Sequence, residues 1–486
     1  MSEGTIFTKS RCGRKGIDLP ALDVPPVDPA AVFGAGSLRS APAGLPEVSE
    51  AQAVRHFVNL SSKNYHVDKG MYPLGSCTMK YNPKMNEDLA RLPGFTGLHP
   101  LAPEELCGGA LQLMDELGRF LCEITGFEGI SLQPAAGAHG ELTGLLLIRN
   151  WHLERGDTAR VEILMPDSAH GTNPASCTLA GFRTVNVKSN SRGEVDIDDL
   201  RAKAGPATAG LMLTNPNTLG IFESGIEEIT RIVHDAGGLC YMDGANMNAM
   251  LGIARPGDMG FDVCHLNLHK TFSAPHGGGG PGSGPVACRD FLARYLPDPV
   301  VTRTGDGGPA MTRPERSFGR LLAFHGHFGV LVRAWAYIRT LGAAGLREAS
   351  ETALLNANYL KARLRDTYDV PYNDGPCMHE FVISGERQAR AGVKTLDIAK
   401  RLLDYGFHAP TVYFPMIVHE SMMIEPTETE SLESLDAFVE AMLSIAREID
   451  AKPHLVTDAP VNTPVLRLDE VRAVKELEIV EKWENS

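Results

Sequence analysis

The residues best suited to chemistry are His269 and Lys270, which end an apolar run and precede a glycine-rich loop. The run is Leu266–Leu268, and the loop extends from His276 to Gly284. Burial at the end of a strand disfavours an ammonium ion and so lowers the pKa of a lysine. A deprotonated lysine is the group that forms a Schiff base with an aldehyde cofactor. An exposed lysine beside a flexible turn is the alternative that these residues alone leave open.

Asp243 is the natural partner of such a lysine, because it closes the apolar run Leu239–Met242 one strand earlier. In a parallel sheet, Asp243 and Lys270 would both lie at the carboxyl edge, where ligands bind in open α/β folds. A buried carboxylate there can keep a pyridine nitrogen protonated, which makes pyridoxal 5'-phosphate (PLP) an electron sink. An N-cap or turn aspartate is the alternative for Asp243 taken alone. Its pairing with Lys270 favours the cofactor role.

A phosphate site is predicted in the small-residue turn Gln133–Glu141, which runs into an apolar helix over 142–148. The free N–H groups at a helix N-terminus attract anions. Glycine-alanine turns are common, so the motif alone is a weak signal. The predicted phosphate contacts are Ala136, Gly137, Ala138, His269 and Thr271.

Two further strand ends carry polar groups suited to the same cofactor. His170 follows the predicted strand Val161–Met165 and could stack on the cofactor ring, although a lone histidine is more often structural. Asn217 follows another strand and could donate to the phenolic oxygen of the cofactor. The gathering of all these groups at the ends of strands is the main argument for a single site.

Composition and charge exclude several classes of protein. The chain has 486 residues, enough for two or three domains, and a formal net charge of −14, which argues against nucleic-acid binding. Its nine cysteines lack CxxC spacing, so neither a disulfide framework nor a metal site is predicted. Without an apolar leader or a membrane-length apolar run, we expect a cytoplasmic protein that does not enter membranes.

Short apolar runs alternate with segments of helical periodicity, which predicts an α/β fold with a mostly parallel sheet covered on both faces. We expect an extended arm and helical segment over 1–95, a large cofactor-binding domain over 96–340 and a smaller α+β domain over 341–486. The predicted strands are Val161–Met165, Thr184–Val187, Ala209–Thr214, Leu239–Met242, Val263–Leu268, Val286–Ala287, 379–383 and 421–425. One helix is predicted to begin at Ser49. The other predicted helices cover 104–125, 142–148, Glu227–Ala236, Leu331–Leu341, 351–366 and 395–405.

The motifs together resemble the fold-type I (aspartate aminotransferase-like) PLP enzymes, and among them the glycine cleavage P-protein (glycine decarboxylase) family. The likeness is to the C-terminal half, which some bacteria make as a separate subunit 2. It spans nearly the whole chain. It rests on Tyr72–Pro83, Gln133–Glu141, His170–Pro174, Asn215–Thr218, Asp243–Asn246 and Leu266–Phe272 with the following glycine loop.

The resemblance implies an activity and a set of partners. Lys270 would be the Schiff-base lysine, Asp243 the pyridinium partner and His170 the ring-stacking residue, while the turn around Gly137 would hold the phosphate. Glycine would lose its carboxylate as CO2, and its aminomethyl group would pass to the lipoyl arm of H-protein. A P-protein subunit 1 of similar fold would complete a hetero-tetramer with two copies of each subunit. Tyr72 and Lys80 would then line an active-site mouth shared with that partner.

Two other functions stay open at this point. One is a different fold-type I enzyme, either a decarboxylase of larger amino acids or a cysteine desulfurase. A desulfurase needs a nucleophilic cysteine in an exposed loop, and none stands in an obvious one; Cys77, in the motif-like loop, is better interpreted as a small buried hydrophobe. The other is a non-catalytic assembly subunit, which the pair of Lys270 and Asp243 argues against.

Overall fold

The computed structural model describes residues 4–41, 43–276, 282–303, 305, 307–372, 375–477 and 479. Residues Gly277–Pro281 of the glycine-rich loop lie outside them. The chain forms two compact units, one over Val67–Ala459 and the other from Met1–His66 and Pro460–Ser486. The domain boundaries expected after residues 95 and 340 stay predictions.

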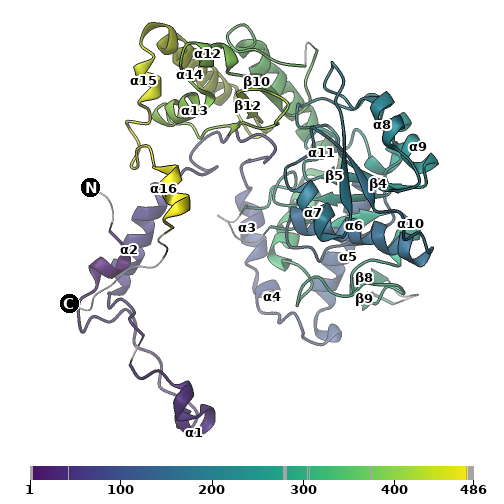
Figure 1. Ribbon diagram of the computed structural model, residues 1–486. Helices are drawn as coiled ribbons and strands as arrows, with labels where there is room; N and C mark the ends of the chain where they lie inside the picture. Colours follow the sequence, from purple (N-terminus) through teal and green to yellow (C-terminus); the bar gives the residue numbers. More distant parts are fainter. Residues whose placement is uncertain are drawn as a thin grey trace. The chain divides into compact units, whose positions relative to one another are not determined.

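A seven-stranded sheet in the order β1-β7-β6-β5-β4-β2-β3 forms the centre of the larger unit (Figure 1). Strands β6, β5, β4, β2 and β3 are parallel, whereas β7 runs antiparallel to both of its neighbours. The six apolar runs predicted for this region are all strands, with ends that shift by a few residues, and β1 was not predicted. The strands are β1 (Gly129–Ser131), β2 (Glu162–Pro166), β3 (Arg183–Val187), β4 (Thr208–Thr214), β5 (Leu239–Gly244), β6 (Val263–Leu266) and β7 (Val286–Cys288).

Helices cover both faces of this sheet, as predicted for a parallel α/β fold. Apolar side chains of α6, α7 and the segments next to them pack on one face, and those of α5, α9 and α11 pack on the other. The helices around the sheet are α3 (Lys84–Ala90), α4 (Pro93–Thr96), α5 (Gly108–Thr125), α6 (Gly137–Glu154), α7 (Asn173–Leu179), α8 (Ile197–Lys203), α9 (Ile226–Asp235), α10 (Asp290–Ala293) and α11 (Phe328–Leu364), with short 3-10 turns η3 (Glu104–Leu106) and η4 (Pro256–Met259). A hairpin of β8 (Val300–Arg303) and β9 (Pro309–Thr312), which was not predicted, forms a separate small sheet.

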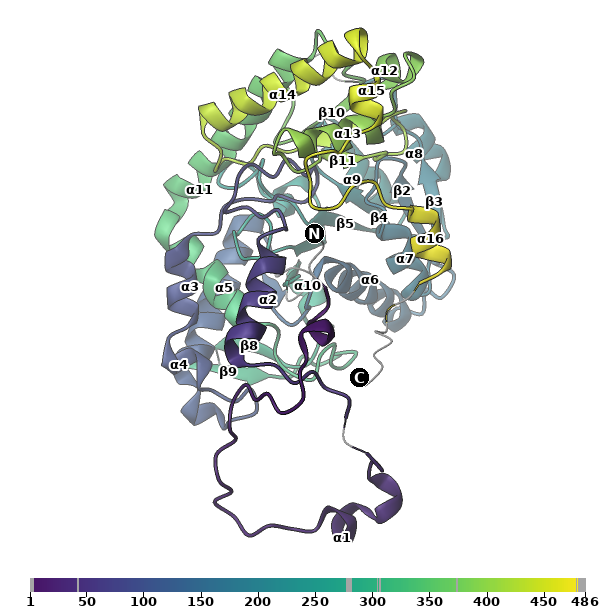
Figure 2. The same cartoon turned by 90° about the vertical axis from the view of Figure 1, so that its left-hand side faces the viewer.

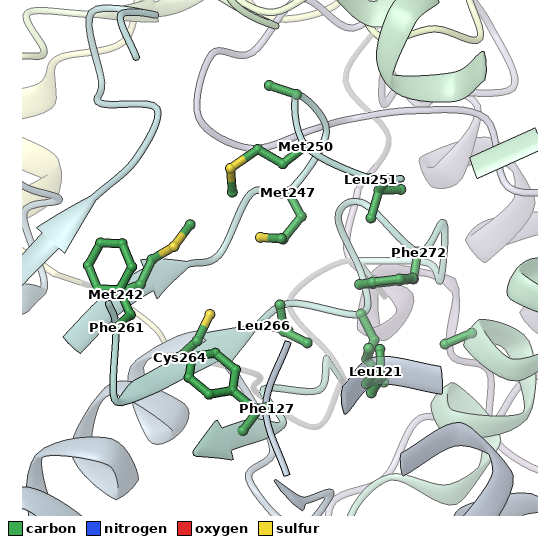
Figure 3. Close-up of a cluster of buried hydrophobic side chains, with 14 of the residues drawn as sticks. Leu121, Phe127, Met242, Met247, Met250, Leu251, Phe261, Cys264, Leu266 and Phe272 are labelled. Carbon is green, nitrogen blue, oxygen red and sulfur yellow. The ribbon is translucent and has the colours of Figure 1, made fainter. Parts of the chain in front are cut away.

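Successive side chains along β5 and β6 point to opposite faces of the sheet, so one face carries apolar core residues and the other carries the polar residues of the predicted site. Met242, Cys264 and Leu266 point into a buried, sulfur-rich cluster with Phe127 and Phe261 (Figure 3). Tyr241, Asp243 and His265 alternate with these residues along the two strands and therefore point to the opposite face, which α6 covers. The apolar core thus fixes which side of the sheet the polar residues occupy.

The C-terminal part of the larger unit is a smaller α+β layer, as predicted, with an antiparallel sheet in the order β10-β12-β11 (Figure 2). The two helices expected over Leu331–Leu341 and 351–366 are the two parts of α11, which a non-helical backbone conformation interrupts at Gly342 (φ 61°). This conformation favours glycine and explains why the helix pattern breaks there. The remaining elements are β10 (Phe381–Ser384), β11 (Thr411–Val412), β12 (Ser421–Ile424), α12 (Glu386–Arg390), α13 (Thr395–Asp404), α14 (Leu432–Ala451) and α15 (His454–Thr457).

The terminal unit has little regular structure apart from the helix predicted to begin at Ser49. This helix, α2 (Glu50–Ser61), starts with a capping box between Ser49 and Gln52. The other elements are η1 (Ile6–Lys9), α1 (Pro29–Phe33), η2 (Ala35–Ser37) and α16 (Glu470–Lys475). No helix among the described residues combines the length and apolarity needed to cross a membrane.

Candidate functional site

Asp243 stands at the end of β5 as a fully buried carboxylate with several donors. Its Oδ2 accepts from His170 Nδ1 at 2.7 Å and from Asn173 Nδ2 at 3.0 Å, and its Oδ1 accepts from the Ala245 N–H at 3.0 Å. Burial alone would raise its pKa, but the nearby histidines and these hydrogen bonds outweigh burial and hold the pKa well below the usual range. Asp243 is therefore an anion, as a pyridinium partner must be.

A continuous chain of contacts joins Asp243 to Lys270. His170 uses Nδ1 for Asp243, and its Nε2 lies 2.6 Å from the Ser76 hydroxyl. The Lys270 ammonium donates to the Ser76 carbonyl at 2.8 Å. The structure thus brings the three predicted catalytic residues together through one loop residue. Ser76 lies within the motif Tyr72–Pro83, but the sequence alone predicts no role for it.

The predicted phosphate turn is the start of α6, where Gly137 is the first helical residue. A Cβ at Gly137 would lie 2.8 Å from the Asn267 side-chain amide, so no larger residue fits without movement. The Asn267 Oδ1 atom is buried and has no hydrogen-bond partner within the described part of the chain. Free N–H groups of an 18-residue helix and a cradle without side chains fit a phosphate-bearing cofactor.

The two residues that flank Lys270 keep donors for such a phosphate. His269 Nδ1 accepts from the Ser283 N–H at 3.2 Å, and burial together with the charges of His276 and Lys270 lowers the pKa of His269 to about 3. A neutral ring with Nδ1 as acceptor carries its proton on Nε2. The Thr271 hydroxyl accepts from the Met247 N–H at 2.9 Å and can still donate its own proton.

Asn217 is engaged elsewhere. Its Nδ2 donates to the Gly193 carbonyl and to Glu223, and its Oδ1 accepts from the Leu219 and Ile221 N–H groups. The side chain is fully buried. The predicted contact with a cofactor oxygen would require Asn217 to give up bonds that hold its own loop, so this assignment stays a prediction without geometric support.

Two glutamates from the C-terminal layer fasten the loop that carries Ser76. Glu380 accepts from the Ser76 N–H at 2.6 Å, and Glu425 accepts from both the N–H and the hydroxyl of Thr78. Ser76 and Thr78 both have positive φ values (63° and 47°), a conformation that other residues must hold in place. Burial, reinforced by Glu425, raises the pKa of Glu380 well above its usual value. Sequence reasoning missed both glutamates, because only the fold brings them to this loop.

Tyr72 and Lys80, the early-loop residues expected to line a mouth shared with a partner, both contact side chains of this chain. Lys80 is buried, and its ammonium donates to Glu428 at 2.6 Å and to the Tyr337 hydroxyl at 3.2 Å. A buried ammonium needs such partners, so Lys80 holds the loop in place. Tyr72 stacks on His408 with ring centroids 3.8 Å apart. Both side chains therefore have partners within this chain.

The cysteines offer no activated nucleophile among the described residues. Cys77, in the motif loop, has its pKa raised by burial, the opposite of what a reactive thiolate requires. Five others are buried, burial raises the pKa of the partly buried Cys122 to about 12, Cys107 is partly buried just before α5, and Cys12 lies in the terminal unit. This weakens the desulfurase alternative.

Comparisons with known proteins identify the relatives of this chain. The family model described as "Glycine cleavage system P-protein" matches residues 30–312, and that described as "Glycine dehydrogenase, C-terminal domain" matches 349–465. A probable glycine dehydrogenase (decarboxylating) subunit 2 of Chlorobium chlorochromatii is 59% identical over 480 residues, which is 99% of each chain. The protein of the same name from Listeria monocytogenes is 56% identical over 97% of this chain and 96% of its own.

Solved structures share the fold at low sequence identity. A glycine decarboxylase (P-protein) in inhibitor-bound form has a TM-score of 0.72 and 22% identity, and the match covers 85% of this chain and 94% of that one. Glutamate decarboxylase of Lactobacillus brevis has a TM-score of 0.67 and 14% identity over 86% and 98% of the two chains. These likenesses establish the fold-type I architecture alone. The sequence matches go further, and by them the chain belongs to the glycine cleavage system P-protein family, in its subunit 2 branch.

Proposed function

We propose that this chain is the cofactor-bearing subunit of a two-subunit glycine decarboxylase, with PLP bound through Lys270. The observation that carries the proposal is the chain of contacts Lys270–Ser76–His170–Asp243, at the edge of the sheet where α/β folds bind ligands. Family membership favours glycine over the larger amino acids of other decarboxylases.

In this proposal each predicted residue holds one part of the cofactor. Lys270 would bind the aldehyde carbon, Asp243 would hold the pyridine nitrogen and His170 would stack on the ring. The first N–H groups of α6, at Ala136, Gly137 and Ala138, hold the phosphate, and His269 and Thr271 add donors. Asn217 is the assignment that its hydrogen bonds favour least.

The chain's own residues prepare the chemistry. When bound, PLP supplies an electron sink that allows glycine to lose its carboxylate as CO2. Asp243, held as an anion, keeps a proton on the ring nitrogen, and electrostatic stabilisation of this kind is worth several kcal/mol. The bond from His170 to Asp243 fixes the plane of the imidazole. Lys270 is held by the Ser76 carbonyl, which orients the amine.

The same proposal names the partners. The aminomethyl group passes to the disulfide of a lipoyl arm on H-protein, so no nicotinamide or flavin is needed. A subunit 1 of similar fold completes the enzyme as a hetero-tetramer with two copies of each subunit. The subunit 2 names of the relatives support the first part of this assembly.

Exchange of labelled bicarbonate into the carboxyl group of glycine tests the function. We expect exchange when the chain is combined with PLP, a lipoylated H-protein and a subunit 1, and none with the Lys270→Ala variant. An assembled, PLP-loaded complex that ignores glycine but decarboxylates a larger amino acid would overturn the proposal. A complex in which Lys270→Ala exchanges at the normal rate would make this chain a scaffold.

A further inference from the structure

A second layer of polar residues lies behind Asp243. His265 on β6 pairs in register with Asp243 on β5, and its Nε2 lies 3.5 Å from Asp243 Oδ1. Tyr241 stands two residues before Asp243, on the same face of the sheet, and its hydroxyl lies 2.7 Å from His265 Nδ1. Tyr241 and His265 are fully buried. The three side chains thus form a row, in the order Tyr241, His265, Asp243.

The protonation of this row follows from its surroundings. Burial, with Asp243 as a lesser cause, raises the pKa of Tyr241 well above its usual value, so the phenol keeps its proton. Burial lowers the pKa of His265, so the ring is neutral and carries one proton. A proton on Nδ1 would turn the Nε2 lone pair toward an anion. The favoured arrangement has the Tyr241 hydroxyl donating to Nδ1 and the Nε2 proton pointing at Asp243 Oδ1.

Helix α6 is shaped to fit over this row. A Cβ at Gly144 would lie 2.1 Å from the Tyr241 ring, and a Cβ at Gly140 would lie 2.9 Å from the Cβ of His265. These two glycines are four residues apart and share one face of the helix. The helix whose N-terminus would hold the phosphate therefore seals the row from water.

A donor aimed at Asp243 changes where a shared proton resides. His265 Nε2 makes no hydrogen bond within the described part of the chain, but its N–H dipole, aimed at Asp243 Oδ1 from 3.5 Å, favours the carboxylate over the acid, so a proton between Asp243 and a ring nitrogen stays on the nitrogen. A second carboxylate makes the donor more important, because Glu141 lies within 4.8 Å of Asp243 and His265. Thr172 and Ser176 donate to Glu141. Like charges at this distance disfavour ionisation, and the N–H of His265 offsets that effect.

We propose that Tyr241 and His265 are positioning residues that keep Asp243 ionised and aimed at the cofactor, so that the pyridine nitrogen remains protonated. The proposal rests on the proposed function, since it concerns the same cofactor. Neither residue touches the reacting atoms. Tyr241 acts by fixing the tautomer of His265, and His265 acts through its N–H dipole, which points at Asp243 from 3.5 Å.

The test uses Tyr241→Phe, which removes one hydroxyl and keeps the ring over Gly144. The matched control is Tyr368→Phe, because Tyr368 is equally buried and loses one bond, to the Met442 carbonyl at 2.9 Å in the C-terminal layer. Each chain is assembled with its subunit 1 and loaded with PLP labelled with nitrogen-15 in the ring. NMR of the label reports the protonation of the ring nitrogen directly.

We expect Tyr241→Phe to move the nitrogen signal toward the unprotonated value and to slow carboxyl exchange about five- to tenfold, the effect of one lost hydrogen bond. Tyr368→Phe should change neither the nitrogen signal nor the rate of carboxyl exchange. If Tyr241→Phe fails to fold, His265→Gln and His265→Leu replace it. The first keeps an N–H near the Nε2 position and should retain the signal, whereas the second should shift it.

The experiment distinguishes failure of the proposed function from failure of the positioning role. If the loaded, unmodified complex gives no nitrogen signal from bound PLP, the proposed function itself fails. If it gives a protonated signal that neither Tyr241→Phe nor His265→Leu changes, PLP binding stands and the positioning role is overturned.

Discussion

Asp243 decides the chemistry at the scale of single residues, because one carboxylate collects donors from several parts of the chain. Its charge survives complete burial because His170, Asn173 and the Ala245 N–H all donate to it and because His265 lies close by. Such concentrated support is typical of a group whose charge is used. An aspartate with only a structural role at a strand end would need fewer hydrogen-bond donors.

The variant Asp243→Asn keeps the shape of the side chain and removes its charge. We expect a folded protein that still binds PLP but loses two to three orders of magnitude in carboxyl exchange, because an electrostatic contribution of about 3–4 kcal/mol is lost. Exchange kinetics at saturating glycine measure the loss. A variant with near-normal exchange would refute the role assigned to Asp243.

At the scale of elements, the start of helix α6 forms the predicted phosphate site. Its first residue, Gly137, meets the Asn267 amide, whereas Gly108, the first residue of α5, has open space around it. Both helices have 18 residues, so the two glycines form a matched pair.

Gly137→Ala should weaken PLP binding about tenfold or more, because the new methyl group pushes Asn267 or the turn away from the phosphate. Gly108→Ala should leave PLP binding unchanged, since its methyl group touches nothing among the described residues. Titration of each unloaded protein with PLP, followed by visible absorbance, makes the comparison. Equal affinities for the two variants would remove the phosphate site from this turn.

A second element-scale contact joins α3 to α11. Arg333 donates two hydrogen bonds to the Glu87 carboxylate, each 2.8 Å long, and both side chains are about one-fifth exposed. This bond holds the pKa of Glu87 below its usual range. Its stabilisation is therefore present above the unfolded-state pKa of about 4.3 and is lost as pH falls through the lowered value.

Glu87→Gln should cost about 1–2 kcal/mol in the free energy of unfolding at pH 7, and less as the pH is lowered below about 4. The control is Glu351→Gln, in the part of α11 after Gly342. Its partner Arg347 is 61% exposed, so this change should cost under about 0.5 kcal/mol. Urea unfolding at a series of pH values measures both. A cost for Glu87→Gln that does not change with pH would show that packing, rather than charge, explains it.

Local sequence patterns predicted much of this fold, but they could not predict contacts between residues that lie far apart in the chain. Apolar runs located the six predicted strands of the large sheet, and strand ends located Lys270 and Asp243, because burial and side-chain period are local properties. The loop at Ser76 could not be completed in this way, since Glu380 lies 304 positions away in the chain. His265 left a weak signal, a polar residue inside an apolar strand. The break of α11 at Gly342 agrees with the two separate helices that the sequence predicts there, because glycine interrupts the helix pattern.

At the scale of the whole molecule, the terminal unit stands apart in character from the larger one. Its apolar side chains are largely exposed, including Leu19 (86%), Leu22 (74%) and Phe33 (68%). Helix α2 also leaves Phe57 and Val58 more than half exposed. Apolar surface of this extent is typical of a segment that is covered by a partner.

Deleting residues 1–30 should weaken assembly with subunit 1 and leave PLP absorbance intact, because the arm contributes no predicted site residue. Ordering an arm costs about 1–2 kcal/mol of backbone entropy per residue, which a partner surface has to offset. Sedimentation of the mixed subunits measures assembly. A shortened chain that assembles and decarboxylates normally would make the arm a dispensable tail.

The most direct test of the account is the identity of the residue that binds PLP. Reduction of the loaded, unmodified complex with borohydride fixes the cofactor to its lysine, and peptide mapping locates it. We predict that the label lies on Lys270, and that Lys270→Ala folds normally but acquires no label. A label on any other lysine, or an unchanged label in Lys270→Ala, would contradict the site described above.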